Sequence, residues 1–188
     1  IKGYELDNYE ADDIIGTLSR QADEEDFETI IITGDRDLTQ LATDNVTIYY
    51  TKKGVTDVDH YTPKFIAEKY NGLVPKQIID MKGLMGDTSD NIPGVAGVGE
   101  KTAIKLLNQF ESVEGVYEHI EEVTAKKLKE KLINSKDDAL MSKDLATINV
   151  HSPIEVSLED TKLTLQDDTT EKIELFKKLE FKQLLADI

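Results

Sequence analysis

Residues 86–103 read GDTSDNIPGVAGVGEKTA, and this stretch is the most informative part of the chain. Its centre, residues 92–99, is a glycine-rich loop between two segments with helical apolar spacing, residues 75–85 and 100–110. The glycine spacing does not fit a Walker A loop, and no strand precedes the loop as a dinucleotide-binding fingerprint requires. We interpret it as a helix–hairpin–helix unit, in which small residues let a DNA backbone approach and N–H groups bind phosphate.

The residues expected to contact DNA lie in this loop and in the helix that follows it. Lys101 and Lys105 are four residues apart, so they share one face of that helix. Residues 92–109 hold two lysines and one glutamate, a local excess of positive charge in a chain whose formal net charge is −16. A simple tight turn between packed helices is the alternative. The expected DNA-binding residues are Gly94, Gly97, Val98, Gly99, Lys101, Thr102 and Lys105, and the loop carbonyls are a candidate K⁺ site.

The overall composition is acidic, with 38 Asp and Glu against 22 Lys and Arg in 188 residues. Taken alone, this argues against a nucleic-acid partner, because phosphate binding uses basic residues. Hydrophobic residues make up 39% of the chain, enough for a core, and the lack of cysteine excludes thiolate metal sites. No apolar run approaches the ~20 residues of a membrane span. We expect a cytoplasmic, nucleoid-associated protein that does not contact membranes.

Before residue 60 the pattern alternates between helix and strand. Residues 10–25 carry apolar residues at helical spacing. Residues 28–33 contain the apolar run of a buried parallel strand, and residues 46–50 are β-branched and aromatic. This alternation predicts an α/β fold.

Beyond residue 60 the pattern is mainly helical. Thr62 followed by Pro63 is a helix cap with proline at the first helical position. Further helices are predicted at residues 112–121, 124–134, 136–147 and 171–185, and a short strand at residues 153–158. The predicted parts are an incomplete α/β core at residues 1–60, a helical subdomain with the helix–hairpin–helix at residues 61–150, and a closing strand and helix that pack on the core at residues 151–188.

Three short acidic motifs form the candidate catalytic site. Residues 10–13 (EADD) open the first helix, residues 35–37 (DRD) follow the first strand, and residues 87–90 (DTSD) precede the glycine loop. Each has a structural alternative, since acidic residues cap helices and aspartates stabilise turns. Ligands bind outside the carboxyl ends of the strands in an open α/β sheet, so we expect the motifs to meet there.

A shared site of this kind needs cations. Glu10 and Asp13 are three residues apart, as are Asp87 and Asp90, so each pair is expected to share a helix face. Crowded carboxylates repel unless a cation neutralises them, and oxygen ligands favour Mg²⁺ or Mn²⁺. Two such ions about 4 Å apart serve phosphodiester hydrolysis, whereas a calcium EF-hand lacks its glycine and glutamate here. The candidate catalytic and metal-ligating residues are Glu10, Asp12, Asp13, Asp35, Asp37, Asp87 and Asp90.

The same motifs resemble the 5′-nuclease family, the 5′–3′ exonuclease and flap endonuclease domains of bacterial DNA polymerases I. Residues 9–13 (YEADD), 33–38 (TGDRDL) and 86–103 carry the resemblance, which extends over the whole chain. It implies a PIN-like parallel-sheet core with a mostly helical helix–hairpin–helix DNA-binding subdomain. It also implies hydrolysis of phosphodiesters at 5′ flaps, nicked duplexes and RNA primers during DNA replication and repair.

The resemblance further implies two divalent cations. Glu10 and Asp12 then serve the first ion, and the aspartates of the DRD and DTSD motifs serve the second, with Asp13 close by or acting through water. Family members also carry an amino-terminal segment with two more aspartates and a basic helical arch, and this sequence has neither. We therefore expect the carboxyl-terminal part of the domain, an under-ligated first metal, impaired activity of the isolated chain and a polymerase module in the same polypeptide.

Three other hypotheses remain. Residues 35–39 (DRDLT) match the D-x-D-x-T motif of haloacid-dehalogenase-type phosphatases, but Gly34 separates the strand from the nucleophile and the EADD motif stays unexplained. A PIN-type ribonuclease shares carboxylates on an α/β core but usually lacks a helix–hairpin–helix. A DNA-binding or scaffolding fragment with an incomplete acidic site is the non-catalytic hypothesis.

Overall fold

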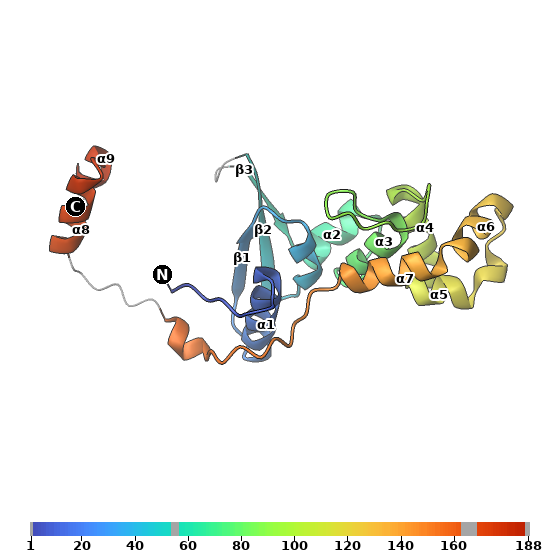
Figure 1. The fold of residues 1–188 in the computed structure, drawn as a ribbon, viewed down its shortest axis with the longest axis horizontal. Helices are drawn as coiled ribbons and strands as arrows, with labels where there is room; N and C mark the ends of the chain where they lie inside the picture. The colour runs from blue at the N-terminus through green and yellow to red at the C-terminus, as the bar shows by residue number, and fades with distance from the viewer. Residues whose placement is uncertain (1, 54–56, 163–168, 187–188) are drawn as a thin grey trace. The chain divides into compact units, whose positions relative to one another are not determined.

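The computed structural model describes residues 2–53, 57–162 and 169–186 (Figure 1). The chain divides into two compact units, one of residues 4–155 and one of residues 1–3 with 156–188. The larger unit holds every predicted site residue. None of the helices in the described ranges combines the length and the apolar character that a membrane span requires.

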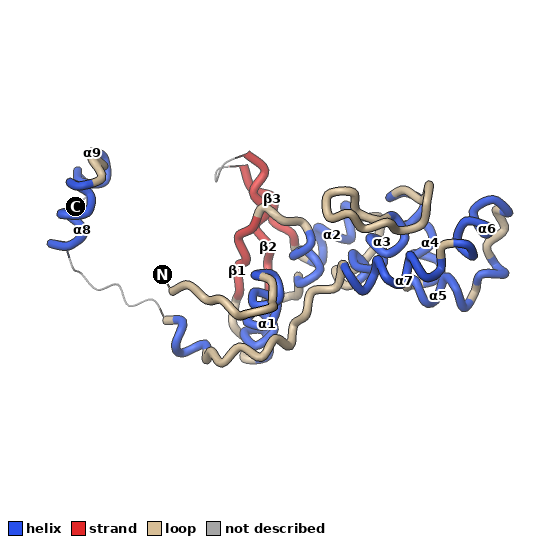
Figure 2. The backbone as a smooth tube through the Cα atoms, viewed as in Figure 1, coloured by secondary structure: helices blue, strands red, loops and turns tan. Residues whose placement is uncertain are grey.

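A three-stranded sheet lies in the first part of the larger unit (Figure 2). β1 (Thr29–Thr33) runs parallel to β2 (Val46–Lys53), and β3 (Asp57–Tyr61) pairs with β2 antiparallel. The parallel pair confirms the α/β fold class and both predicted strands. β3 was not predicted because its charged sequence, DVDHY, lacks an apolar pattern, although the rings of Tyr49 and His60 stack at 4.0 Å across the pair.

The prediction that β1 is a buried strand holds for one of its faces only. Ile31 is buried, whereas Ile30 and Ile32 are 50% and 71% exposed. Side chains alternate along a strand, so one face of β1 joins the core and the other does not. Within the described part of the chain, β2 is the only strand that pairs with β1.

Two helical segments pack beside the sheet, and the first of them, α1, follows the predicted pattern closely. α1 (Ala11–Glu24) begins after Glu10 and buries Ile14 and Ala22 on its apolar side. The short 3-10 helix η1 (Asp37–Leu41) follows β1 after a bend and buries Leu38. Both segments therefore begin at acidic motifs while their apolar residues are held in the core.

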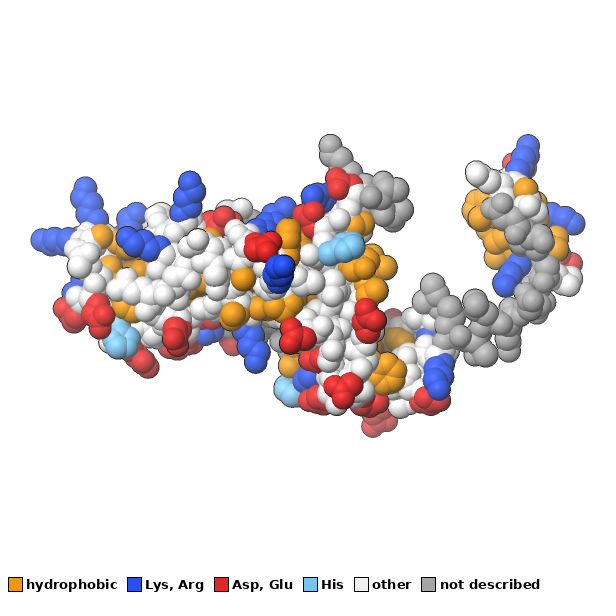
Figure 3. Space-filling view, turned by 180° about the vertical axis from the view of Figure 1, so that it is seen from behind, with side chains coloured by type: hydrophobic (Ala, Val, Ile, Leu, Met, Phe, Trp, Pro, Cys, Tyr) orange, Lys and Arg blue, Asp and Glu red, His pale blue; other side chains and the backbone are white. Residues whose placement is uncertain are grey.

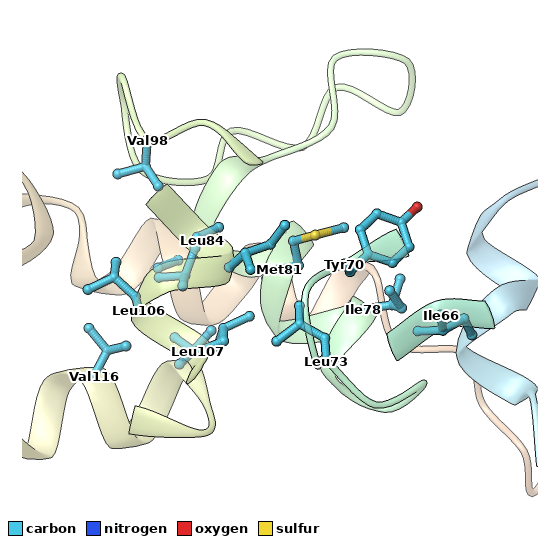
Figure 4. Close-up of a cluster of buried hydrophobic side chains, with 14 of the residues drawn as sticks. Ile66, Tyr70, Leu73, Ile78, Met81, Leu84, Val98, Leu106, Leu107 and Val116 are labelled. Carbon is cyan, nitrogen blue, oxygen red and sulfur yellow. The ribbon is translucent and has the colours of Figure 1, made fainter. Parts of the chain in front are cut away.

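The helical subdomain confirms the predicted succession of helices. Thr62 caps the first of them, since its hydroxyl accepts a hydrogen bond from the N–H of Phe65. Leu84 and Leu107 lie within the core that the helices share (Figure 4). The elements are α2 (Pro63–Lys69), α3 (Gln77–Met85), α4 (Glu100–Phe110), α5 (Val113–Glu118), η2 (Ile120–Glu122), α6 (Lys126–Asn134) and α7 (Lys136–Leu145).

α3 is the central helix, because it packs against α4, α5 and α7. A partly buried ion network adds to this packing. The ammonium of Lys143 on α7 lies 2.7 Å from Asp80 on α3 and 2.6 Å from Glu114 on α5. Asp80 also accepts a hydrogen bond of 2.8 Å from the N–H of Val113. Apolar and polar contacts together hold α3, α5 and α7 in one arrangement.

Residues 146–152 return from the helical subdomain to the α/β core. The N–H of Asn149 donates to Asp13 at 2.9 Å, and the N–H of Ser152 donates to the hydroxyl of Thr17 at 2.9 Å. These bonds tie the segment along α1, so the last part of the larger unit is fastened to its first helix.

Two predictions for the last part of the chain are corrected. Residues 153–158 form no strand, because a strand needs a neighbour to bond with and this segment has none among the described residues. The predicted closing helix is divided into α8 (Thr169–Lys178) and α9 (Lys182–Ala186), since Glu180 between them adopts a φ of 57°. The smaller unit also contains the 3-10 helix η3 (Leu158–Thr161). That this part packs on the core stays a prediction.

Candidate active site

The end of β1 and the start of η1 position the DRD motif. The hydroxyl of Thr33 accepts a hydrogen bond of 2.9 Å from the N–H of Asp35, and the carboxylate of Asp35 accepts one of 2.8 Å from the N–H of Asp37. This tight turn leaves Asp35 exposed and Asp37 half-buried. Both residues lie just beyond the carboxyl end of a parallel strand, as the sequence pattern predicted.

The DTSD motif belongs to a closed loop after α3. Asp87 and Ile92 exchange backbone hydrogen bonds of 2.9 and 2.8 Å. At the neck of the loop Gly86 and Gly94 cross, with φ of 72° and 58°. A Cβ atom at Gly94 would lie 2.1 Å from the backbone nitrogen of Gly86, so only glycine fits at this crossing.

The prediction that Asp87 and Asp90 share a helix face is wrong, because α3 ends at Met85 and both aspartates lie in the loop. They nevertheless meet Asp37. One carboxylate oxygen from each of the three aspartates lies within 4.8 Å of the other two. Two ligands on opposite sides of a divalent ion, with bonds of about 2.1–2.4 Å, have a similar separation. The three residues could therefore hold a metal ion, and their donor set of oxygens suits a hard cation.

A lysine that the sequence reasoning missed lies among these aspartates. Lys82, on the last turn of α3, has a side chain that is 10% exposed, and its ammonium contacts Asp37. The same ammonium lies 2.7 Å from Asp87 and 3.8 Å from Asp90. Burial opposes its charge, but hydrogen bonds to Asp37 and Asp87 raise the pKa of Lys82. A lone lysine in the otherwise apolar end of a helix was the available signal.

The aspartates around Lys82 titrate differently. Burial acts to raise the pKa of Asp87, but hydrogen bonds from Lys82 and Ser89 lower it to about 2. For Asp37, burial is the largest cause and raises the pKa, although the hydrogen bond and charge of Lys82 act in the opposite direction. Lys82 thus neutralises the cluster only in part.

The residues of the EADD motif have different surroundings in the structure. Burial raises the pKa of Asp12, and the charges of Asp35, Glu10, Asp37 and Asp13 raise it further, in that order. The charges of Asp35 and Asp37 therefore act on Asp12, which is not one of the three residues whose carboxylate oxygens converge.

Glu10 and Asp13 do not share a helix face as predicted, since Glu10 is the extended N-cap residue of α1. One oxygen of Asp13 accepts a hydrogen bond from the N–H of Glu10 at 3.2 Å, and the other accepts from the N–H of Asn149 at 2.9 Å. Asp13 thus holds the start of α1 and the returning segment. This is the capping role that the sequence left open as an alternative.

Replacing Asp12 with asparagine is expected to stabilise the metal-free chain at pH 7. Its folded-state pKa is raised, so the ionised group destabilises the folded state, and this cost vanishes as the pH falls through the folded pKa towards the unfolded value of about 3.9. Screening by solvent keeps the effect small, about 1–3 °C in melting temperature. Circular dichroism melts in chelator at pH 7 and pH 4 measure it, with Asp44→Asn as an exposed control. A lower melting temperature at pH 7 would contradict the prediction.

The glycine loop has an inward and an outward side. Val98 is 4% exposed and Gly94 is buried, with its N–H donating to the hydroxyl of Ser142 at 2.9 Å. Of the expected DNA-binding residues, these two therefore shape the loop from within. Those on the outside are Gly97, Gly99, Lys101 and Lys105, which are exposed, and Thr102, which is half-buried.

Lysines from two helices flank the outer side of the loop. Lys101 and Lys105 form no ion pair with any residue that the structure describes. Lys131 on α6 approaches Gly97 so closely that a Cβ there would lie 2.3 Å from its ammonium nitrogen. Basic side chains gather at the end of the larger unit formed by α6 (Figure 3). Lys131 extends the basic surface beyond the residues predicted from the motif.

A cleft of about 490 Å³ opens beside the DRD turn, Lys82 and the DTSD loop. Tyr50, Tyr70 and Glu100 line it as well, and none of the three was predicted as a site residue. Burial, with nearby charges, raises the pKa of Tyr70 to about 12, so its hydroxyl stays protonated at neutral pH. Glu100 is the first residue of α4, so the cleft extends from the acidic cluster to the start of that helix.

The fold and this cleft define an α/β protein with a cluster of three aspartates, able to hold a cation, beside a glycine-rich loop between two helices. Residues 1–71 match the family model described as "5'-3' exonuclease, N-terminal resolvase-like domain". Residues 73–169 match the model described as "5'-3' exonuclease, C-terminal SAM fold". The chain therefore belongs to the 5′–3′ exonuclease family. That it holds only the carboxyl-terminal part of the domain is not confirmed, because the N-terminal model matches too.

Curated relatives agree with this assignment. DNA polymerase I of Bacillus subtilis (strain 168) is 61% identical and DNA polymerase I of Bacillus caldotenax is 56% identical, each over 186 residues. Both matches cover 98% of this chain but 21% of the relative. The chain thus spans about a fifth of the length of these relatives.

Solved structures share the fold. A zinc-bound T5 5′-exonuclease has a TM-score of 0.67 at 24% identity, covering 78% of this chain and 52% of that one. The catalytic core of Rad2 in complex with a DNA substrate has a TM-score of 0.57 at 20% identity, covering 87% of this chain and 56% of that one. The family match favours the nuclease hypothesis over the phosphatase, ribonuclease and non-catalytic hypotheses.

Proposed function

We propose that this chain is part of a metal-dependent 5′–3′ exonuclease and 5′-flap endonuclease, which hydrolyses phosphodiesters in DNA replication and repair. The observation that carries the proposal is the group of Asp37, Asp87 and Asp90, whose oxygens lie within 4.8 Å of one another. The DTSD part of that group is joined through the Gly86–Gly94 crossing to the glycine loop. The proposed metal ligands Asp87 and Asp90 and the proposed DNA-binding loop therefore lie in one short segment, residues 86–103.

The proposed cofactors are two divalent cations, Mg²⁺ or Mn²⁺. Asp35, Asp37, Asp87 and Asp90 hold one, and Glu10 and Asp12 hold the other, with Asp13 close by. Bound there, such cations supply a water of lowered pKa and stabilise the leaving oxygen. The raised pKa of Asp12 is compatible with this assignment: burial is its largest cause, and the charges of Asp35, Glu10 and Asp37 raise it further, which a bound cation would offset.

The proposed partner is duplex DNA with a 5′ flap, a nick or an RNA primer. Gly97 and Gly99 leave space for the backbone, Lys101 and Lys105 neutralise phosphates, and the loop carbonyls hold a K⁺ ion. Thr102 contacts DNA from the start of α4, whereas Gly94 and Val98 act by shaping the loop. Other partners are a polymerase module and an amino-terminal segment of the same polypeptide, since the relatives named DNA polymerase I are much longer than this chain. We place the protein in the cytoplasm, at the nucleoid.

Replacing Lys101 and Lys105 together with glutamine is expected to weaken duplex binding roughly tenfold and to reduce the slope of log affinity against log salt by about 2. Each lysine that neutralises a phosphate releases about one counterion on binding, so the salt slope counts the lost contacts. Fluorescence anisotropy with a labelled duplex in chelator measures both quantities. Lys64→Gln, an exposed lysine on α2, is the control. An unchanged salt slope would place the DNA on another surface.

The proposal is tested with a labelled 5′-flap duplex, with Mg²⁺ or Mn²⁺ and with chelator. Two proteins are compared: this chain, and the same chain preceded by the amino-terminal segment of its domain. Metal-dependent release of short products is the expected result. Cleavage only by the longer protein would mean that this chain holds part of the site. If neither protein cuts or binds the flap with metal present, the proposed function is wrong.

A further inference from the structure

Asp37, Asp87 and Asp90 already surround one cation, the ammonium of Lys82. It hydrogen-bonds to Asp37 and lies 2.7 Å from Asp87 and 3.8 Å from Asp90. These are the same three carboxylates whose oxygens converge within 4.8 Å. The ammonium therefore lies in the space that a divalent ion held by these oxygens would need.

The two cations cannot share this space. Lys82 is buried on the last turn of α3, so its ammonium has lost most of its water and depends on the carboxylates for solvation. A divalent ion a few ångströms away would repel it, more strongly than in water because the site is half-buried. Lys82 also lines the cleft of about 490 Å³, which gives the side chain room to leave the carboxylates.

We propose that Lys82 is an internal counter-cation that competes with the divalent metal ion at Asp37, Asp87 and Asp90. In the metal-free protein its ammonium balances their charge and stabilises the loop after α3. Metal binding requires the ammonium to move into the cleft, so Lys82 lowers the metal affinity of the site. This inference rests on the proposed metal site and deepens it by naming the residue that regulates metal loading.

Calorimetric titration of the 188-residue chain with Mn²⁺ tests the competition. Lys82→Met is expected to bind Mn²⁺ roughly tenfold or more tightly, because no ammonium has to be displaced. Its metal-free melting temperature is expected to fall, since three carboxylates then lack their cation, and Mn²⁺ is expected to raise it by more than in the wild type. Lys64→Met is the control for loss of a lysine outside the site. Equal or weaker Mn²⁺ binding by Lys82→Met overturns the inference.

A second measurement uses the wild-type chain, so it does not depend on the folding of the variant. The ¹⁵N signals of lysine ammonium groups are recorded with and without Mg²⁺, and Lys82→Arg assigns the Lys82 signal. The expected result is a signal protected from water exchange that Mg²⁺ shifts or removes; a signal that saturating Mg²⁺ leaves unchanged overturns the inference. If the wild type binds metal but both measurements are negative, only this inference fails. If neither the wild type nor Lys82→Met binds metal, the proposed metal site fails with it.

Discussion

Cleavage of a 5′-flap duplex is expected to fall roughly a thousandfold when Asp37 is replaced with asparagine, because a lost metal ligand removes several kcal/mol of charge stabilisation from the transition state. Asp37 is the residue of the DRD turn whose carboxylate converges with Asp87 and Asp90. Asparagine has the same shape and can still accept the hydrogen bond from Lys82. The change therefore removes the charge with little disturbance of the fold.

The assay is a single-turnover rate at saturating Mg²⁺, made with whichever form of the domain cleaves. Asp44→Asn is the matched control, since Asp44 is an exposed aspartate outside the site, and its rate is expected to match the wild type. Binding of the flap in chelator is measured alongside. A loss of less than tenfold with Asp37→Asn, at unchanged binding, would exclude Asp37 as a ligand that the reaction needs.

Replacing Gly94 with alanine is expected to lower the free energy of unfolding by about 3 kcal/mol or more, about 6–12 °C in melting temperature. The alanine Cβ would lie 2.1 Å from the backbone nitrogen of Gly86 and 2.6 Å from its Cα. Gly94 also has a φ of 58°, which alanine adopts poorly. Because the neighbouring atoms are backbone, the loop must open to accept the methyl group.

Gly34→Ala is the matched control, since the nearest atom to its Cβ, the hydroxyl oxygen of Thr51, would lie 3.7 Å away. Its effect is expected to stay within about 0.5–1 kcal/mol. Chemical denaturation of both variants gives the comparison. Equal stabilities would mean that the crossing of Gly86 and Gly94 relaxes readily, so that it does not hold the loop.

This crossing links the two halves of the proposed function. On one side of it lies the loop that carries Asp87 and Asp90, and on the other lies the outward side of the glycine loop with Gly97. This neck sets the separation between the proposed metal ligands and the proposed DNA-binding surface. In the proposed nuclease, this separation decides which phosphodiester reaches the metal ions, so Gly94→Ala is expected to impair positioning as well as stability.

The acidic composition is compatible with this function because the charges are segregated. Carboxylates gather beside the DRD turn, where burial and then the charges of neighbouring carboxylates raise the pKa of Asp12. Lys101, Lys105 and Lys131 lie around the glycine loop instead. The net charge of the chain therefore says little about the surface proposed to bind DNA.

Much of the fold was predictable from local patterns. Helical periodicity located α1 and the helices from α3 to α7, and the apolar run located β1. β3 and the break between α8 and α9 were missed, since one depends on pairing with β2 and the other on a positive φ at Glu180. A strand was wrongly predicted at residues 153–158, because β-branched residues form a strand only beside a partner strand.

The sequence by itself determined the family, the acidic motifs and the helix–hairpin–helix, because these depend on residue type and spacing along the chain. Only the tertiary structure decided which carboxylates converge. It also showed that these carboxylates have different parts. The pKa values of Asp12 and Asp37 are raised by burial and by other acidic groups, whereas the oxygens of Asp13 accept hydrogen bonds from the backbone N–H groups of Glu10 and Asn149. The tertiary structure also placed Lys82, 45 residues away from Asp37 in sequence, inside the acidic cluster. Contacts between residues so far apart depend on how α3 packs against η1, and the periodicity of neither segment contains that information.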